Sequence, residues 1–306
     1  SFASRSYGSG GGIVNKNGTL NITRSTISGN SASNSSNDNF SFNDTNSPAG
    51  GGGIANTGTS LITNSTISDN VADSGGGIAN SSGELTLLNS TISGNSASQS
   101  NGGIANQSLD GDEQGTLTLT NTTVSDNSAE LFAGGVGNYN GSITVAQSTI
   151  SDNSAEGVYN YSGMATLTNS IISSNAEDLV NEGTLNTEGV NLVEDGSLTG
   201  TDIINEDPQL APLQDNGGFT LTQLPLGNSP VIDAGSNTAI PADTLDLDGD
   251  GDTQENIPAD QRRLERLVND RVDLGAVEVQ DPESRELVLD IANVETTEGD
   301  ADTNTT

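Results

Sequence analysis

The sequence has no cysteine, no histidine and no tryptophan. Chains without cysteine are common among exported bacterial proteins. Aromatic residues make up 3% and hydrophobic residues 30% of the 306 residues, which is little for a compact α/β domain. The scarcity of aromatics also removes the usual platform on which sugar rings stack. Low hydrophobicity with a net charge of -34 is typical of disordered chains, so an ordered fold has to follow from another property of the sequence.

Basic residues are also few. Eight Lys and Arg residues stand against 42 Asp and Glu residues, and none lies between Ser25 and Gln261. A nucleic-acid-binding protein neutralises phosphates with Lys or Arg, so this function is excluded for the middle of the chain. Acidic lipid surfaces and polyanionic sugars are disfavoured by the same charge argument. A divalent cation is the natural partner of such a surface.

Long apolar runs are missing as well. No run approaches the roughly 20 residues that span a bilayer, so we expect no transmembrane segment. The sequence opens inside Gly- and Ser-rich repeats with no signal peptide, and we expect it to be an excised or processed piece of a longer chain.

Internal repeats dominate what is present. One phrase reads Ser-Thr-Ile-Ser-Gly/Asp-Asn, and it occurs, with close variants, at Ser25–Asn30, Ser65–Asn70, Ser90–Asn95, Thr122–Asn127, Ser148–Asn153 and Ser170–Asn175. A second phrase, Gly-Gly-Gly-Ile-x-Asn, occurs at Gly10–Asn15, Gly51–Asn56 and Gly75–Asn80 and more loosely later. A third, Gly-Thr-Leu-x-Ile/Leu, occurs for example at Gly18–Ile22.

These phrases predict a right-handed parallel β-helix. Their apolar residues alternate with a period of two, which is the strand period. The last asparagines of the first phrase are 40, 25, 32, 26 and 22 residues apart, so about 22 residues form one coil and the excess forms polar inserts. Each coil is expected to have three short strands and to bury its apolar side chains only by stacking on its neighbours.

Two columns of stacked residues follow from the alignment of the phrases. We expect one interior column of apolar side chains, formed by Ile27, Ile67, Ile92, Val124, Ile150 and Ile171. We expect a second column at a coil corner, formed by Asn30, Asn70, Asn95, Asn127, Asn153 and Asn175. Asparagine tolerates left-handed turns, and stacked amides can hydrogen-bond from coil to coil.

The repeats resemble those of chlamydial polymorphic outer-membrane proteins and, more closely, those of bacterial, often cyanobacterial, pectin-lyase-like β-helix surface proteins. The later chain carries the same resemblance through Gly189–Val193, Asp207–Leu213, Asp215–Thr222, Ser229–Gly235 and Val272–Glu278. Two residues depart from the pattern of that group: Gln223 stands where histidine is frequent, and Arg263 where glycine usually follows Asp-Gln-Arg. The resemblance implies a β-helix on a secreted or cell-surface protein, and it implies no activity.

Three regions are predicted. Residues 1–205 form the β-helix, residues 206–279 form a mostly irregular C-terminal cap with an acidic insert, and residues 280–306 form a linker or the start of a following domain. The last region resembles the opening strand of a Calx-β domain. The arginines at 262, 263, 266 and 271 either hold the cap onto the last coil or serve a partner.

Two aspartates are candidates for catalysis. Asp126 and Asp152 share a repeat position on neighbouring coils. Stacked strands lie about 4.8 Å apart, so two such carboxylates are expected to repel each other and to raise the pKa of one of them. Such a pair is what a glycoside hydrolase requires. The alternative is that a turn accepts a small polar residue at this position. A polysaccharide lyase would need a cationic base, which the middle coils lack.

An acidic segment is a candidate calcium site. Asp246, Asp248 and Asp250 match the first, third and fifth ligands of an EF-hand-like loop, with Asp252 and Glu255 as further oxygen donors. Ile257 occupies the twelfth position, where an EF-hand has its bidentate glutamate, so a partial Ca²⁺ loop is the prediction. The alternative is a solvated acidic turn.

The function predicted from these features is that of an extracellular structural or adhesive surface module. It would bind a cell-surface or matrix component or associate with itself, end to end into filaments, and Ca²⁺ would stabilise it. An enzyme is not the favoured prediction. Two alternatives stay open: a carbohydrate-active hydrolase that uses Asp126 and Asp152, and a calcium-dependent glycan-binding module.

Overall fold

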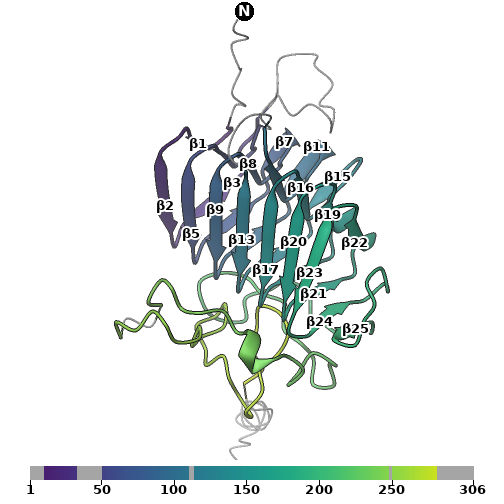
Figure 1. The fold of residues 1–306 in the computed structure, drawn as a ribbon. Coiled ribbons are helices and arrows are strands. Elements are labelled where there is room, and N and C mark those ends of the chain that lie inside the picture. Colours follow the sequence, from purple (N-terminus) through teal and green to yellow (C-terminus); the bar gives the residue numbers. More distant parts are fainter. Residues whose placement is uncertain (1–9, 33–49, 110–113, 248–249, 281–306) are drawn as a thin grey trace, which may run out of the picture.

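The computed structural model describes residues 10–32, 50–109, 114–247 and 250–280, and it is a parallel β-helix followed by an irregular segment (Figure 1). Strands of successive coils pair in parallel to form three long sheets, as the repeats predict. The second, third and first repeat phrases form sheets A, B and C respectively. The predicted tail with Calx-β resemblance lies outside the described residues.

Each sheet takes one strand from every coil. Sheet A contains β1 (Ile13–Asn15), β4 (Ile54–Asn56), β8 (Ile78–Ser81), β12 (Ile104–Gln107), β16 (Val136–Tyr139), β19 (Glu156–Asn160) and β22 (Glu177–Asn181). Sheet B contains β2 (Thr19–Thr23), β5 (Thr59–Thr63), β9 (Glu84–Leu88), β13 (Thr116–Thr120), β17 (Ser142–Ala146), β20 (Met164–Thr168) and β23 (Thr184–Glu188). Sheet C contains β3 (Thr26–Ser28), β6 (Thr66–Ser68), β10 (Thr91–Ser93), β14 (Thr123–Ser125), β18 (Thr149–Ser151), β21 (Ile171–Ser173), β24 (Asn191–Val193) and β25 (Ile203–Ile204).

A fourth sheet, which the sequence analysis did not predict, joins sheets C and A in three of the coils. It contains β7 (Val71–Ser74), β11 (Ser96–Ser100) and β15 (Ser128–Ala129). The Gly-Gly-Gly phrases form the corner between this sheet D and sheet A. A Cβ atom on Gly52 would lie 2.2 Å from the carbonyl oxygen of Gly76 on the next coil, so only glycine allows the coils to stack this closely here.

The interior is a continuous column of aliphatic side chains. Ile62, Leu87, Leu119, Val145 and Leu167 from sheet B are fully buried and pack against the apolar residues of sheets A and C. Leu198 and Ile203 pack against the same core beyond the last full coil.

The interior column of sheet C confirms five of the six predicted residues and corrects the sixth. Ile150 pairs with Ile172, whereas Ile171 pairs with Thr149. Ile171 therefore points outward, where it packs with Leu192, Val231 and Leu274 in a separate apolar cluster. Its phrase reads Ser-Ile-Ile-Ser, so both central residues are apolar, and the threonine position was mistaken for the interior one.

The predicted asparagine column is a continuous amide ladder. Each Nδ2 donates to the Oδ1 of the next coil, for example from Asn95 to Asn127 at 2.9 Å and from Asn127 to Asn153 at 3.0 Å. The ladder runs from Asn30 to Asn175 and ends on the carboxylate of Asp178. It satisfies amides that are buried from water at a coil corner.

A second amide ladder of the same kind stands between sheets A and B, and the sequence analysis missed it. Its members are the last asparagines of the second phrase and their equivalents: Asn15, Asn56, Asn80, Asn106, Asn138, Asn160 and Asn181. The Nδ2 to Oδ1 distances are 2.7 to 2.8 Å. The recurrence of Asn at the end of every such phrase was the signal that could have revealed it.

Residues 206–280 lie along the side of the solenoid, below the arrowheads of the sheet-B strands in Figure 1. The described residues of this segment contain one short 3-10 helix, η1 (Asn237–Ala239), and otherwise turns and isolated bridges. The segment covers the outer face of sheet C from the third described coil onward, so that Thr26 is exposed whereas its equivalents Thr91, Thr123 and Thr149 are buried. No helix in the described residues is long and apolar enough to span a bilayer.

Gln261 is the main polar anchor of this segment. Its Nε2 donates to the Ser90 carbonyl at 3.1 Å and to Thr91 Oγ1 at 3.0 Å, and its Oε1 accepts from Thr123 Oγ1 at 2.7 Å. The segment is thereby fixed to the middle coils.

Candidate ligand-binding groove

An arm formed by residues 241–247 and 250–258 overhangs the outer face of sheet B. Ile257 and Leu247 of the arm pack with Ile240 and Val272 of the C-terminal segment in a small apolar cluster. Asp243 is buried at its base, and its carboxylate accepts a hydrogen bond from the Leu247 N–H at 2.7 Å. The arm therefore holds a defined position above the solenoid.

A groove lies between this arm and the solenoid. Its inner part, about 390 Å³, has a wall of sheet-B side chains that includes Thr86, Thr118 and Thr120 and an opposite wall that includes Leu245 and Leu247. Thr86 and Thr118 pair with each other and continue through Thr144 to Thr166, so that this wall is part of a row of threonines along the outside of sheet B. The groove thus combines regularly spaced hydroxyl groups with apolar contacts.

The outer part of the groove is larger, about 690 Å³, and it contains two arginines from opposite ends of the chain. Arg24 occupies the corner between β2 and β3, and Arg263 belongs to the C-terminal segment. The guanidinium carbon of Arg24 lies 4.3 Å, and that of Arg263 5.8 Å, from the centre of the Phe219 ring, which is 46% exposed. Arg24 and Arg263, which lie on either side of the long stretch of sequence without basic residues, are therefore close together in the structure.

The proposed catalytic aspartates do lie on neighbouring coils. Ser125 pairs with Ser151, which places Asp126 beside Asp152 at a corner where both residues have φ values near 57°. The pKa of Asp152 is raised by partial burial and by the charge of Asp126, while the hydrogen bond from Gln223 opposes the rise. Gln223 Nε2 donates to Asp152 Oδ2 at 2.6 Å, so one carboxylate oxygen is already occupied.

The acidic insert forms a chain of turns at the tip of the arm. Asp246 Oδ1 accepts from the Gly251 N–H at 3.0 Å, Asp250 Oδ1 from the Asp252 N–H at 2.7 Å, and Asp252 Oδ1 from the Gln254 N–H at 2.9 Å. Asp248 lies outside the described residues. Within the described part of the chain, no three acidic side chains are gathered in the manner of a metal site. The Ca²⁺ loop, Glu255 included, stays a prediction.

Two arginines of the C-terminal segment, Arg262 and Arg266, belong to a buried charge cluster. Arg262 makes an ion pair of 2.7 Å with Asp260, and the fully buried Arg266 donates from Nη2 to Gln147 Oε1 at 2.6 Å. Burial raises the pKa of Glu278 to about 8 and that of Asp273 to about 6. Because Gln147 belongs to a middle coil, this cluster holds the segment to the side of the solenoid and not across its last coil.

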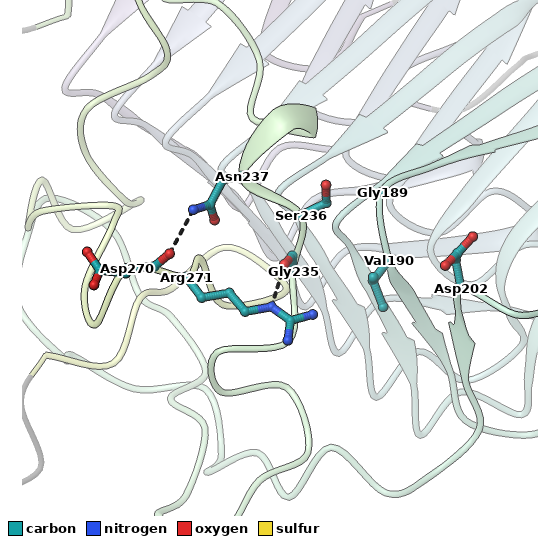
Figure 2. A pocket seen from close by; sticks show the side chains of 8 residues that line it. All are labelled: Gly189, Val190, Asp202, Gly235, Ser236, Asn237, Asp270 and Arg271. Atoms are coloured by element: carbon teal, nitrogen blue, oxygen red, sulfur yellow. Dashed lines mark hydrogen bonds between the residues drawn. The ribbon is translucent and has the colours of Figure 1, made fainter.

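A second hollow, of about 540 Å³, lies at the last coils between Gly189, Asp202 and the region around η1 (Figure 2). Arg271 crosses it, and its Nε donates to the Gly235 carbonyl at 3.0 Å. Its Nη2 donates to the Ala234 carbonyl at 2.9 Å. The arginine serves here as a link between two loops.

The few aromatic residues are not scattered. Phe132, Tyr139, Tyr159 and Tyr161 form a cluster outside sheet A with ring centres 5.7 to 6.4 Å apart. Tyr159 belongs to β19 and pairs with Gly137 of the neighbouring strand β16 in sheet A. Tyr139 and Tyr159 are buried in this cluster, whereas Phe132 is 37% exposed.

Comparisons with models of known protein families, with curated proteins and with solved structures give no match. The functional argument therefore rests on the fold and on the groove.

Proposed function

We propose that this chain is an extracellular, non-catalytic adhesive module that binds a linear carbohydrate in the groove between sheet B and the arm. The observation that carries this proposal is the shape and chemistry of the groove, which follows the coil stack and is lined by hydroxyl, amide and leucine side chains. Such mixed walls suit a sugar polymer, whose hydroxyl edges need hydrogen bonds and whose C–H faces need apolar contact.

The scaffold supports binding by a preformed site. Two amide ladders and a continuous aliphatic core tie every coil to its neighbours, so that the threonine row of sheet B keeps its spacing. A rigid site loses less conformational entropy when a ligand binds. The resemblance to bacterial β-helix surface proteins motivates the extracellular, cell-surface setting.

End-to-end assembly is not part of the proposal. Leu198 and Ile203 cover the core at the last coil, and β25 extends sheet C beyond it. These residues occupy the place where a further coil of sheet C would begin.

Catalysis by Asp126 and Asp152 is not part of the proposal either. The Gln223 side chain contacts Asp152, and Ser151 Oγ donates to Gln223 Oε1, so that the amide is fixed in place. A retaining or inverting hydrolase needs both carboxyl groups free to face the scissile bond.

A pair of matched variants tests the function. Thr118→Tyr puts a ring into the inner groove, whereas Thr166→Tyr places the same ring at the equivalent half-buried position two coils further, outside the residues that line the groove. On a panel of immobilised polysaccharides we expect binding by the wild type and by Thr166→Tyr, and its loss in Thr118→Tyr. Equal binding by all three proteins, or by none, contradicts the proposal.

A further inference from the structure

We infer that the outer part of the groove is an anion subsite, in which Arg24 and Arg263 bind the carboxylate or sulfate group of an acidic polysaccharide. This inference deepens the proposed function and rests on it. It also reverses the expectation from net charge that polyanionic sugars are disfavoured.

Among the described residues, the guanidinium groups of Arg24 and Arg263 differ from those of the other arginines in having no polar partner. Although the chain has 42 acidic residues, neither the Arg24 nor the Arg263 side chain has a hydrogen bond or an ion pair with any described residue. Each is exposed, and each guanidinium carbon lies near the Phe219 ring. The other arginines of the C-terminal segment, Arg262, Arg266 and Arg271, all donate to carboxylate, amide or carbonyl oxygens.

Both arginines have an unusual backbone conformation. Arg24 has φ 48° and Arg263 has φ 70°, a left-handed region that favours glycine or asparagine. The coil positions equivalent to Arg24 confirm this preference, because they hold Asn64, Asn89, Asn121, Gln147, Asn169 and Gly189. An arginine at such a position is sterically disfavoured, and a strained residue at a cleft is a reason to look for a function.

The two guanidinium groups are also close to each other in space. Both line the same part of the groove, and both lie within 6 Å of the centre of the Phe219 ring. A planar guanidinium donates two parallel hydrogen bonds to a carboxylate or a sulfate, which a point charge does not. Thr63 and Asn64 line the same space and offer partners for sugar hydroxyl groups.

The surrounding charge restricts the ligand further. Asp246 and Glu265 also line the outer groove, so a densely charged polymer would meet repulsion there. At 0.15 M salt the Debye length is about 8 Å, which screens the distant acidic residues but not these two. The subsite therefore favours a polymer whose anionic groups are widely spaced along the chain.

Matched ligands and matched variants test the inference. The ligands are dextran, lightly carboxymethylated dextran and lightly sulfated dextran, measured by calorimetry in 0.15 M NaCl with EDTA. The variants are Arg24→Gln, Arg263→Gln and the control Lys16→Gln, which removes one positive charge from a different corner of the Arg24 coil. Arg24→Lys keeps the charge and removes the planar group. Circular dichroism checks that each variant is folded.

We expect at least one of the two charged polymers to bind the wild type. The difference in affinity between carboxymethylated and sulfated dextran shows whether the subsite selects carboxylate or sulfate. Arg24→Gln and Arg263→Gln should each weaken this binding about tenfold or more, Arg24→Lys should restore it only in part, and Lys16→Gln should leave it unchanged. Neutral dextran should bind at least tenfold more weakly.

Two results would overturn the inference. One is equal binding of neutral and charged dextran, and the other is unchanged affinity in both arginine variants. If Thr118→Tyr still abolishes binding of a neutral polysaccharide in either case, the groove function stands and only the anion subsite is rejected. If no polysaccharide binds and Thr118→Tyr has no effect, the proposed function fails as well.

Discussion

The side chains of Asn95 and Asn127 are joined coil to coil, with Asn95 Nδ2 donating to Asn127 Oδ1 at 2.9 Å and the Asn95 N–H donating to the same oxygen at 3.1 Å. Both residues are buried, and Asn127 Nδ2 also reaches the Ile92 carbonyl at 3.0 Å. One amide therefore satisfies backbone and side-chain groups of three successive coils.

Replacing Asn127 by alanine should lower the free energy of unfolding by about 2–4 kcal/mol, because several buried polar groups lose their partner at once. Asn186→Ala, at an exposed position on the outside of sheet B, is the control and should change stability by less than about 0.5 kcal/mol. Urea unfolding followed by circular dichroism measures both. Similar midpoints for the two variants would show that the ladder contributes little.

Ile171 and Ile172 are adjacent in sequence but belong to different cores, and their alanine variants should differ in effect. Ile172→Ala opens a cavity in the solenoid and should cost about 2–5 kcal/mol in urea unfolding. Ile171→Ala weakens the contact with Val231 and Leu274 and should mainly release the C-terminal segment. Limited proteolysis should then cut residues 206–280 faster in Ile171→Ala than in Ile172→Ala. The reverse order of cleavage rates would contradict the corrected register.

The buried carboxyl groups of the C-terminal segment should make its stability depend on pH. Burial raises the folded-state pKa of Glu278 to about 8 and that of Asp273 to about 6, in the presence of Asp260, Arg262 and Arg266. Both pKa values exceed those of the same groups in the unfolded chain. The two carboxyl groups therefore make their full contribution to the free energy of unfolding below about pH 4, and this contribution is lost as the pH rises through 6 and 8.

The melting temperature is therefore expected to fall between pH 5 and pH 8.5 in the wild type. Glu278→Gln cannot ionise, so its melting curve should show a smaller decline over the same range, whatever its overall stability. A wild-type melting temperature that rises over this range would contradict the assignment of a protonated Glu278.

The Asp126–Asp152 pair gives a prediction that is independent of catalysis. Because the charge of Asp126 raises the pKa of Asp152, Asp126→Asn should lower it. Gln223→Ala should raise it, since it removes the 2.6 Å hydrogen bond to the carboxylate. Carboxyl ¹³C NMR titration follows both.

No hydrolysis of neutral glycans is expected, and turnover that disappears in Asp152→Asn would revive the hydrolase hypothesis.

Calcium binding by the acidic insert is a further prediction. We expect calorimetry with Ca²⁺ to show binding that is weakened in Asp248→Ala and in Asp250→Ala, because each removes a charged oxygen ligand. Asp215→Ala, in another exposed turn of the C-terminal segment, is the control. Identical heats for the wild type and the insert variants would identify Asp246–Glu255 as a turn without a metal.

The repeats were sufficient to predict the three long sheets and one amide ladder, because every coil imposes the same environment on equivalent residues. The error at Ile171 arose where two neighbouring positions were both apolar, so the pattern no longer distinguished the inside from the outside. Sheet D was missed because its strands, such as Ser96–Ser100, are polar and irregular in length.

The groove could not be predicted, since the segment that forms its second wall does not share the repeat. Its position depends on contacts such as Gln261 Nε2 to the Ser90 carbonyl, between residues 171 positions apart. The pairing of Arg24 with Arg263 around Phe219 depends on the same docking. The small number of basic residues in the sequence therefore did not indicate that Arg24 and Arg263 would lie close together.

Hydrogen–deuterium exchange with and without a bound oligosaccharide tests whether the ligand lies between sheet B and the arm. Ligand should slow exchange in the arm, around Thr244–Leu247, and in the facing strands β5 (Thr59–Thr63) and β13 (Thr116–Thr120). The aromatic cluster around Tyr159 should exchange at the same rate in both samples. Protection confined to that cluster, with no change in the arm or in these strands, would contradict the account.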